Sequence, residues 1–270
     1  MLKAYYFLWR RAGMTRNEFI KYYEEIHVDL IVSNLPRASD FRRNYPAWQH
    51  SHADHLGSLP FDVLTAITYD SRASFEEAMR VYHSPAFNEV VTEDELRFIN
   101  RGRVRFVPVD EVIDQTSDDQ WRPAPAVPEG AKLLRLTRRP ATIDPNAFHS
   151  IYEAAEVPGI RPLINGCVDY RRNYIRVDDP FCFMTPELQA EIGSHGLVGS
   201  DLVEEFCFID TVSAAAAAVK LDAAPVVAGP LGGAVRTSAI SCVQHVRAPS
   251  IGTGSGAPSR RNSISAAPEA

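Results

Sequence analysis

The sequence predicts an α+β fold in which two tandem ferredoxin-like (βαββαβ) units pack sheet to sheet as an intrachain dimeric α/β barrel. Two observations lead to this prediction: an internal repeat, and the order of strand and helix signals within each copy. The length of 270 residues has room for two small domains. With 45% hydrophobic and 23% charged residues, the composition excludes a fully disordered or collagen-like chain.

The chain repeats itself when it is aligned with itself at a shift of 129 residues. Over residues 3–45, 14 of the 43 aligned positions are identical without a gap, and the strongest match pairs residues 40–45 (DFRRNY) with 169–174 (DYRRNY). A linker rich in Asp and Pro and a final stretch of Ser, Gly, Pro and Ala complete the pattern. We therefore expect a first unit at 1–114, a linker at 115–130, a second, diverged unit at 131–248 and a disordered tail at 249–270.

Each unit is expected to open with a strand and then a helix. Runs of aromatic or aliphatic residues predict strands at 4–9 and 133–136. A capping box at Thr15–Glu18 and the N-cap pair Asp144–Pro145 begin the helices that follow. Apolar residues then recur with helical period as far as Leu30. The remaining elements are expected as strands at about 39–46 and 167–175, strands at 61–69 and 201–209, helices from about 71 and 211, and strands near 103–109 and 240–246.

The predicted order leaves one face of each sheet to its helices and the other face to the partner sheet. Two such faces packed together form a closed barrel. A pocket between the two sheets is then the expected place for a small molecule.

Charge and hydropathy argue against two classes of partner, nucleic acids and membranes. A net charge of −6 without a basic half argues against a nucleic-acid binder. No segment is long and apolar enough to span a membrane, and the apolar run after Met1 is too short for a signal peptide. The four cysteines have no C-x-x-C spacing, which favours reduced thiols. We expect a cytoplasmic protein that binds neither nucleic acid nor membrane.

The first copy resembles the EthD family of dimeric α/β-barrel proteins. The resemblance covers about residues 2–112 and depends on an F-x-x-Y-[YW]-x-x-x-H pattern formed by Phe19, Tyr22, Tyr23 and His27. It implies a cofactor-free barrel. Relatives in that family include fungal dehydratases of anthraquinone pathways, and the wider superfamily includes polyketide cyclases, isomerases, cofactor-free monooxygenases and haem-degrading enzymes. The second copy lacks the histidine, since Glu156 takes its place.

The candidate catalytic residues are His27, Arg43 and Tyr45. An imidazole beside the apolar stripe of a helix could act as a general acid or base; alternatively, His27 caps the helix end. Arg43 shares a strand face with Tyr45 and could polarise a carbonyl. The alternative is a structural role for the repeated arginines, in a pair of interdomain salt bridges with Asp40 and Asp169. The expected substrate-binding residues are Tyr5, Trp9, Tyr23, Arg172 and Tyr174. For Tyr5 and Trp9 on the first strand, the alternative is a place in the hydrophobic core.

A histidine-rich loop offers a different chemistry. His50, His52, Asp54 and His55 form an H-x-H-x-D-H sequence that resembles the metal motif of metallo-β-lactamase-fold hydrolases. The repeat leaves no room for that fold. A local metal site and a polar loop without metal remain open.

Three functions follow from these residues. The first is an enzyme of the lyase or isomerase type, a dehydratase or cyclase of secondary metabolism, that uses no cofactor and acts by proton transfer on a hydrophobic aromatic or polyketide-like substrate. The second is a metal-dependent hydrolase at the histidine-rich loop. The third is a non-catalytic binder of small molecules. The assembly is expected to be a monomer with an intrachain pseudo-dimer, or a homodimer.

Overall fold

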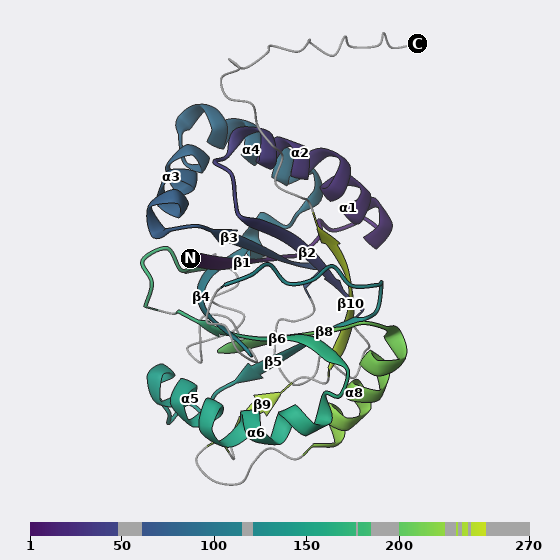
Figure 1. The fold of residues 1–270 in the computed structure, drawn as a ribbon. Helices are drawn as coiled ribbons and strands as arrows, with labels where there is room; N and C mark the ends of the chain where they lie inside the picture. Colours follow the sequence, from purple (N-terminus) through teal and green to yellow (C-terminus); the bar gives the residue numbers. More distant parts are fainter. Residues whose placement is uncertain are drawn as a thin grey trace.

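Two units with the same order of main elements, β-α-β-β-α-β, form the molecule in the computed structural model (Figure 1). The structure describes residues 1–47, 61–114, 121–176, 178–184, 200–224, 231, 234–236 and 239–246. The first unit consists of β1 (Leu2–Leu8), α1 (Arg16–Tyr22), η1 (Tyr23–His27), α2 (Val28–Asn34), β2 (Asp40–Pro46), β3 (Val63–Tyr69), α3 (Arg72–Tyr82), α4 (Pro85–Phe98), η3 (Arg101–Arg103) and β4 (Arg105–Ile113). The second unit consists of β5 (Lys132–Arg138), α5 (Pro145–Ile151), η4 (Tyr152–Glu156), α6 (Val157–Ile160), η5 (Arg161–Leu163), β6 (Cys167–Ile175), β7 (Phe183–Met184), β8 (Leu202–Phe208), α8 (Thr211–Ala223), β9 (Val235–Arg236) and β10 (Ile240–Val246).

Eight antiparallel strands close into a barrel. The first unit contributes the order β4-β1-β3-β2 and the second contributes β6-β8-β5-β10. The two sheets join at two seams, where β2 pairs with β10 and β4 pairs with β6. Helices α1 to α4 cover the outer face of the first sheet, and α5, α6 and α8 cover that of the second (Figure 1). The expected fold class is confirmed, with each seam made from one strand of each unit.

The helix starts agree with the sequence signals. Thr15 caps α1, because its hydroxyl accepts from the backbone of Glu18 and the Glu18 carboxylate accepts from the backbone of Thr15. Asp144 caps α5 by accepting from the backbone N–H groups of the second and third residues that follow it. Short strands β7 and β9 and helix α4 are additions that the repeat did not predict. The capping residues therefore mark where each first helix begins.

The first helix of each unit contains a π turn at the same place. In the first unit it is η1, and in the second it is η4. A π turn accommodates one extra residue in the helix and changes the direction of the side chains at that point. His27 and Glu156 are the final residues of the two π turns, and both side chains are buried.

Alternation along β1 separates two hydrophobic regions. Tyr5 and Phe7, with Trp9 just beyond the strand, belong to the cluster inside the barrel. Ala4 and Leu8 belong to the cluster between the first sheet and its helices. Successive residues of a strand face opposite sides, so this one strand contributes to the barrel core and to the helix-covered core.

The repeated RRNY motif connects elements of the fold. Arg43 and Tyr45 both donate to the carboxylate of Glu24, from 2.6 Å at the shortest contact of each. Their counterparts Arg172 and Tyr174 donate to Glu153 in the same way, at 2.6 and 2.7 Å. Each pair thus fixes the second strand of a unit to the first helix of that unit.

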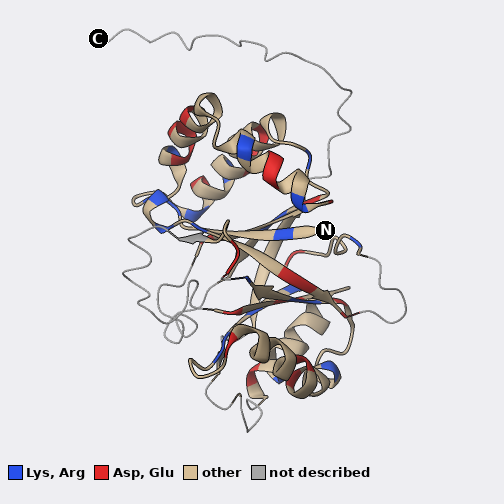
Figure 2. Cartoon of the chain, turned by 90° about the vertical axis from the view of Figure 1, so that its left-hand side faces the viewer, with Lys and Arg blue, Asp and Glu red and all other residues tan. Residues whose placement is uncertain are grey.

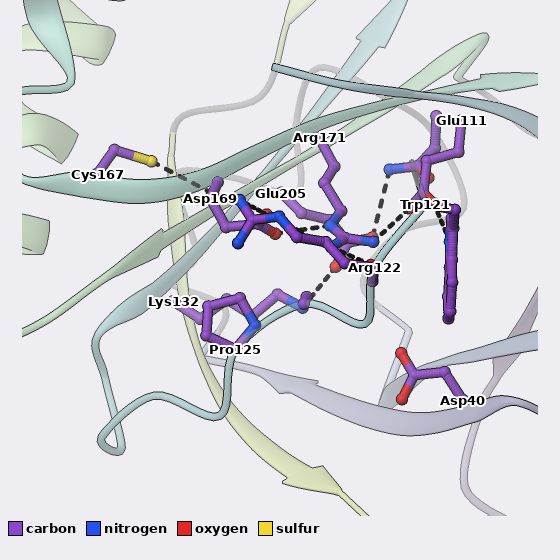
Figure 3. Close-up of polar contacts among 12 residues, drawn as sticks. Asp40, Glu111, Trp121, Arg122, Pro125, Lys132, Cys167, Asp169, Arg171 and Glu205 are labelled. Atoms are coloured by element: carbon purple, nitrogen blue, oxygen red, sulfur yellow. Dashed lines mark hydrogen bonds and ion pairs between the residues drawn. The ribbon is translucent and has the colours of Figure 1, made fainter. Parts of the chain in front are cut away.

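The first arginine of each motif holds the linker instead. Arg42 donates to the carbonyl oxygens of Ala124 and Pro125. Arg171 donates to the carbonyl oxygen of Arg122 at 2.7 Å (Figure 3). Both arginines also pair with the aspartate two residues earlier on the same strand. The partners are those expected, but these ion pairs lie within each unit and not between the two units. The described part of the linker is therefore held by both units.

Candidate functional site

A cavity of about 340 Å³ lies between the outer face of the first sheet and its helices. Small-molecule sites commonly have volumes of this order and above. Its aromatic wall consists of Tyr6, Tyr23, Phe41, Tyr82, Phe106 and Phe181. Its aliphatic wall consists of Leu8, Ile31, Leu35, Ile67, Met79 and Val104. Its polar side chains are His27, Thr65, His83, Asn88, Glu95 and Arg101.

This location differs from the one expected, between the two sheets. The described part of the barrel interior is packed with large side chains, among them Tyr5, Phe7, Trp9 and Phe61. Trp9 and Phe61 meet edge to face, with ring centroids 6.3 Å apart. The volume left open lies on the opposite face of the same strands.

His27 projects into this cavity from the end of η1. Its Nδ1 lies 2.6 Å from Oδ2 of Asp94 on α4, and both side chains are buried. The Tyr22 hydroxyl donates to the other carboxylate oxygen of Asp94 at 2.9 Å. The imidazole also packs against Tyr23 and Phe98, at centroid distances of 5.1 and 4.9 Å.

A carboxylate at Nδ1 favours the tautomer in which Nδ1 carries the proton and Nε2 is free to accept one. The same carboxylate stabilises the imidazolium once Nε2 has taken a proton. His27 and Asp94 can therefore act together as a positioned acid–base pair beside an apolar cavity.

A second polar group lies elsewhere on the wall. The Tyr82 hydroxyl donates to Glu95 at 2.6 Å, and Arg101 lies 3.2 Å from the same carboxylate. Burial and then the charge of Glu95 raise the pKa of Tyr82 above its ordinary value, so this phenol stays protonated. His83, on the rim beside these residues, is exposed to solvent. Tyr82, Glu95 and Arg101 thus form a connected polar group on the cavity wall.

The Tyr23 hydroxyl and the Thr65 hydroxyl form a third polar contact, at 2.6 Å. Burial raises the pKa of Tyr23 above its ordinary value. Tyr23 is thus a neutral hydroxyl one helical turn before His27, on the cavity wall.

The matching space in the second unit is filled. Arg135 stands opposite Glu204 across β5 and β8, as Tyr6 stands opposite Thr65 in the first unit. The Arg135 guanidinium donates to Glu204 at 2.6 Å, and the Tyr170 hydroxyl donates to the same carboxylate at 2.6 Å. These side chains are buried. A buried ion pair therefore occupies the place where the first unit has room for a ligand.

A cluster of buried charges lies inside the barrel. Figure 2 shows Lys, Arg, Asp and Glu on the strands of both sheets as well as on the helices. The ammonium groups of Lys3 and Lys132 lie 2.6 and 2.5 Å from the carboxylate of Glu205, and the Tyr5 hydroxyl donates to the same carboxylate. Figure 3 shows Lys132 and Glu205 among the residues of this region. Lys3 also contacts Glu111 at 2.6 Å.

The lysines keep Glu205 ionised. Burial by itself raises the pKa of Glu205, but the charges and hydrogen bonds of Lys132 and Lys3 outweigh burial and hold the pKa well below its usual range. Lys3 belongs to the first unit and Lys132 to the second. This cluster therefore links the two sheets through one carboxylate.

The sequence-predicted residues divide into three places. His27 and Tyr23 line the cavity, whereas Tyr5 and Trp9 lie inside the barrel. The other four donate to a glutamate on the first helix of their own unit: Arg43 and Tyr45 to Glu24, and Arg172 and Tyr174 to Glu153. The proposed metal ligands His50, His52, Asp54 and His55 lie outside the described residues. Within the described part of the chain, no group of three or more His, Cys, Asp or Glu side chains could hold a metal ion.

Sequence reasoning missed Asp94, Glu95, Tyr82 and Phe181. Asp94 and Glu95 lie on α4, a helix that was not predicted, and Phe181 comes from the second unit. The Pro85 start of α4 was a signal that could have located this helix, because proline is favoured in the first turn.

Comparison with known families identifies the first unit. The family model of the EthD domain matches residues 11–102. The first unit is an EthD domain. The expected resemblance is thereby confirmed, and the match includes His27 and Asp94. A comparison with curated proteins gave no match.

A solved structure of another protein shares the fold of this chain. The structure of an anthrone oxidase-like protein has a TM-score of 0.50 and 12% identity, and the alignment covers 95% of this chain and 96% of that one. A proposed monooxygenase from Lactobacillus acidophilus NCFM has a TM-score of 0.43 and 10% identity, with 92% and 95% covered. At such identities the first likeness shows a common fold. Among the described helices, none has the length and apolar character needed to cross a membrane.

Proposed function

We propose that the EthD domain is a cofactor-free enzyme that binds a hydrophobic, aromatic small molecule in the cavity between its sheet and helices and catalyses a proton transfer. The observation that carries this proposal is the contact between His27 and Asp94 on a largely apolar cavity wall. An acid–base pair in an apolar cavity suits a reaction that needs positioning and one mobile proton.

The lining of the cavity supports the proposed substrate class. Aromatic side chains on several sides favour a planar ring system, which they contact edge on or by offset stacking. The polar side chains of Tyr82 and Arg101 on the wall suit a carbonyl or phenolic oxygen. A hydroxylated aromatic or polyketide-like compound meets both requirements.

The first chemical step is removal of a proton from a carbon next to a carbonyl. Nε2 of His27 takes the proton, and the electron pair of the C–H bond moves into an enolate. Hydrogen-bond donors on the wall, such as the Tyr23 hydroxyl, stabilise the enolate oxygen. If a hydroxyl group is attached to the next carbon, the imidazolium then protonates it and water leaves. The net reaction is a dehydration, which makes the enzyme a lyase.

A second reaction begins with the same step. The fold likeness to an anthrone oxidase-like protein favours an oxidation as the alternative. An anthrone-type carbanion formed at His27 could be oxidised by dioxygen, and the balanced outcome is one quinone and one water for each dioxygen consumed. The presence or absence of dioxygen consumption separates the two reactions.

The test is turnover by purified protein of a panel of β-hydroxy ketones and anthrones, with products analysed by mass spectrometry. His27→Ala should lower turnover by about 100- to 10,000-fold, the range for loss of a general base. His149→Ala is the matched control, because His149 lies on α5 and stacks on Tyr174, away from the cavity. Full turnover by His27→Ala would refute the mechanism, and binding without conversion would favour a non-catalytic carrier.

The metal-hydrolase hypothesis keeps its own test. It depends on residues outside the described chain, and no described contact supports it. Elemental analysis of protein purified without a histidine tag would support it by finding stoichiometric zinc, iron or manganese. Protein with no such metal would remove it.

We also propose that the two units, with the division at 1–114 and 131–248, descend from one duplicated unit. The matching π turns and the matching contacts of the RRNY motif support this origin. Since each unit already has a partner sheet, we propose a monomer in solution, without a second chain. Light scattering coupled to size-exclusion chromatography should give the mass of one chain; a stable homodimer would contradict this proposal.

A further inference from the structure

One wall of the first unit's cavity comes from the second unit. After β6 the chain follows β4: the backbone N–H of Arg176 donates to the carbonyl of Pro108 at 3.0 Å. Strand β7 then pairs with the start of β4, where Phe183 stands opposite Phe106. Residues 178–184 thus lie beside the first unit, although they belong to the second.

Phe181 lies in this segment and reaches the cavity. Of the described residues that line the cavity, Phe181 alone belongs to the second unit. Its ring meets Phe75 of α3 edge to face, with centroids 5.0 Å apart. The Arg72 guanidinium lies 5.0 Å from the same ring. The ring is therefore held against the first helix after β3.

An ion pair fixes the backbone next to Phe181. Arg72 on α3 donates to both carboxylate oxygens of Asp179, at 2.6 and 3.3 Å. Asp179 is buried, and it also accepts from the backbone N–H of Phe181 at 3.0 Å. Its carbonyl accepts from the backbone of Cys182 at 2.8 Å. Asp179 thus closes a tight turn and ties that turn to the first unit.

We propose that Phe181, held by the Arg72–Asp179 ion pair, determines the size of aromatic ligand that the cavity accepts. This inference rests on the proposed function, since it takes the cavity to be a ligand site. The ring is part of the cavity wall, as is Phe106 of β4. Its volume would therefore limit the space left for a planar ligand. The second unit would then have two roles: it closes the barrel, and it sets the selectivity of the EthD domain.

The experiment compares two planar probes, 1-naphthol and 1-hydroxyanthraquinone, by calorimetric titration of the full chain. Phe181→Ala should weaken 1-naphthol binding about tenfold and leave 1-hydroxyanthraquinone binding equal or tighter, because a missing wall costs a small ligand most. Phe181→Trp should shift selectivity the other way. Arg72→Gln should move selectivity in the same direction as Phe181→Ala, by a smaller factor. Asp178→Ala, an exposed change on the same segment, should leave both dissociation constants within twofold.

The two Phe181 variants keep the test independent of stability. If Phe181→Ala and Phe181→Trp keep the wild-type thermal midpoint and shift the selectivity between the two probes in opposite directions, the result would support a wall that selects by size. A general loosening of the structure would shift the selectivity of both variants in the same direction. Suppose that wild-type protein binds 1-naphthol and that both Phe181 variants keep its selectivity within twofold. This result would overturn the role of Phe181 and leave the proposed function standing. If the wild-type chain bound neither probe, the cavity would not be an aromatic site, and both proposals would fail.

Discussion

Tyr6 and Arg135 hold matching positions on the first strands of the two units, but only Tyr6 leaves an open cavity between its sheet and the helices. Tyr6 lines the cavity of the first unit. Arg135 instead fills the matching space with an ion pair to Glu204. The internal symmetry of the barrel thus does not extend to its ligand sites, and a single working site per chain is expected.

Glu156→Gln should therefore leave the turnover rate per folded protein within twofold of wild type. Glu156 replaces His27 at the end of its π turn, but Arg135 and Glu204 occupy the space that a substrate would need. The measurement is the steady-state rate beside His27→Ala. A loss comparable to that of His27→Ala would mean that the second unit takes part in catalysis.

Asp94→Asn should lower kcat at least tenfold while KM changes little. The amide can no longer stabilise the imidazolium, and it can favour the wrong tautomer of His27. The substrate contacts lie elsewhere on the wall and remain. Glu93→Gln on the exposed side of the same helix is the control. Wild-type kcat in Asp94→Asn would show that this carboxylate does not position His27.

Glu205→Gln should destabilise the protein by about 3–5 kcal/mol, the cost of breaking a buried ion pair. The change leaves Lys3 and Lys132 buried without the carboxylate that both contact. Urea unfolding gives the free energy. Glu76→Gln, on the exposed face of α3, should cost less than 1 kcal/mol. If Glu205→Gln also lowered the free energy of unfolding by less than about 1 kcal/mol, the cluster would contribute little to stability.

The same cluster predicts how stability depends on pH. The folded pKa of Glu205 lies well below its unfolded value, so its contribution is fully present above about pH 4.3, the ordinary value for a glutamate. The contribution decreases as the pH falls below that value toward the folded pKa. Urea midpoints measured between pH 7 and pH 3 should fall more steeply for wild type than for Glu205→Gln. Parallel curves would contradict this assignment.

Local signals in the sequence were enough for the β-α-β-β-α-β order of each unit, although not for α4, β7 and β9. The Thr15 capping box and the Asp144 N-cap determine helix starts by short-range hydrogen bonds, and strand alternation needs only neighbouring residues. Together with the repeat they led to the barrel. Such signals involve residues only a few positions apart, so they predict individual helices and strands and not the contacts between distant ones.

The site depends on contacts that no local signal contains. Alternation on β1 shows two faces, but whether the barrel side or the helix side keeps an open volume depends on how Phe7, Trp9 and Phe61 fill the interior. Asp94 meets His27 from a distant helix, and Phe181 arrives from the other unit. The repeated RRNY motif was prominent for a related reason: its contacts hold the helices and the linker in both copies, so its repetition reflects a demand of the fold.

The central claim is that the ligand binds between the sheet and helices of the EthD domain. The most direct measurement is a crystal structure of the full chain with 1-hydroxyanthraquinone bound. We predict electron density for the ring system among Tyr23, Phe41, Phe106 and Phe181, with an oxygen or ring carbon of the ligand within reach of Nε2 of His27. Density inside the barrel, or beside Arg135 in the second unit, with the His27 cavity empty, would contradict the account.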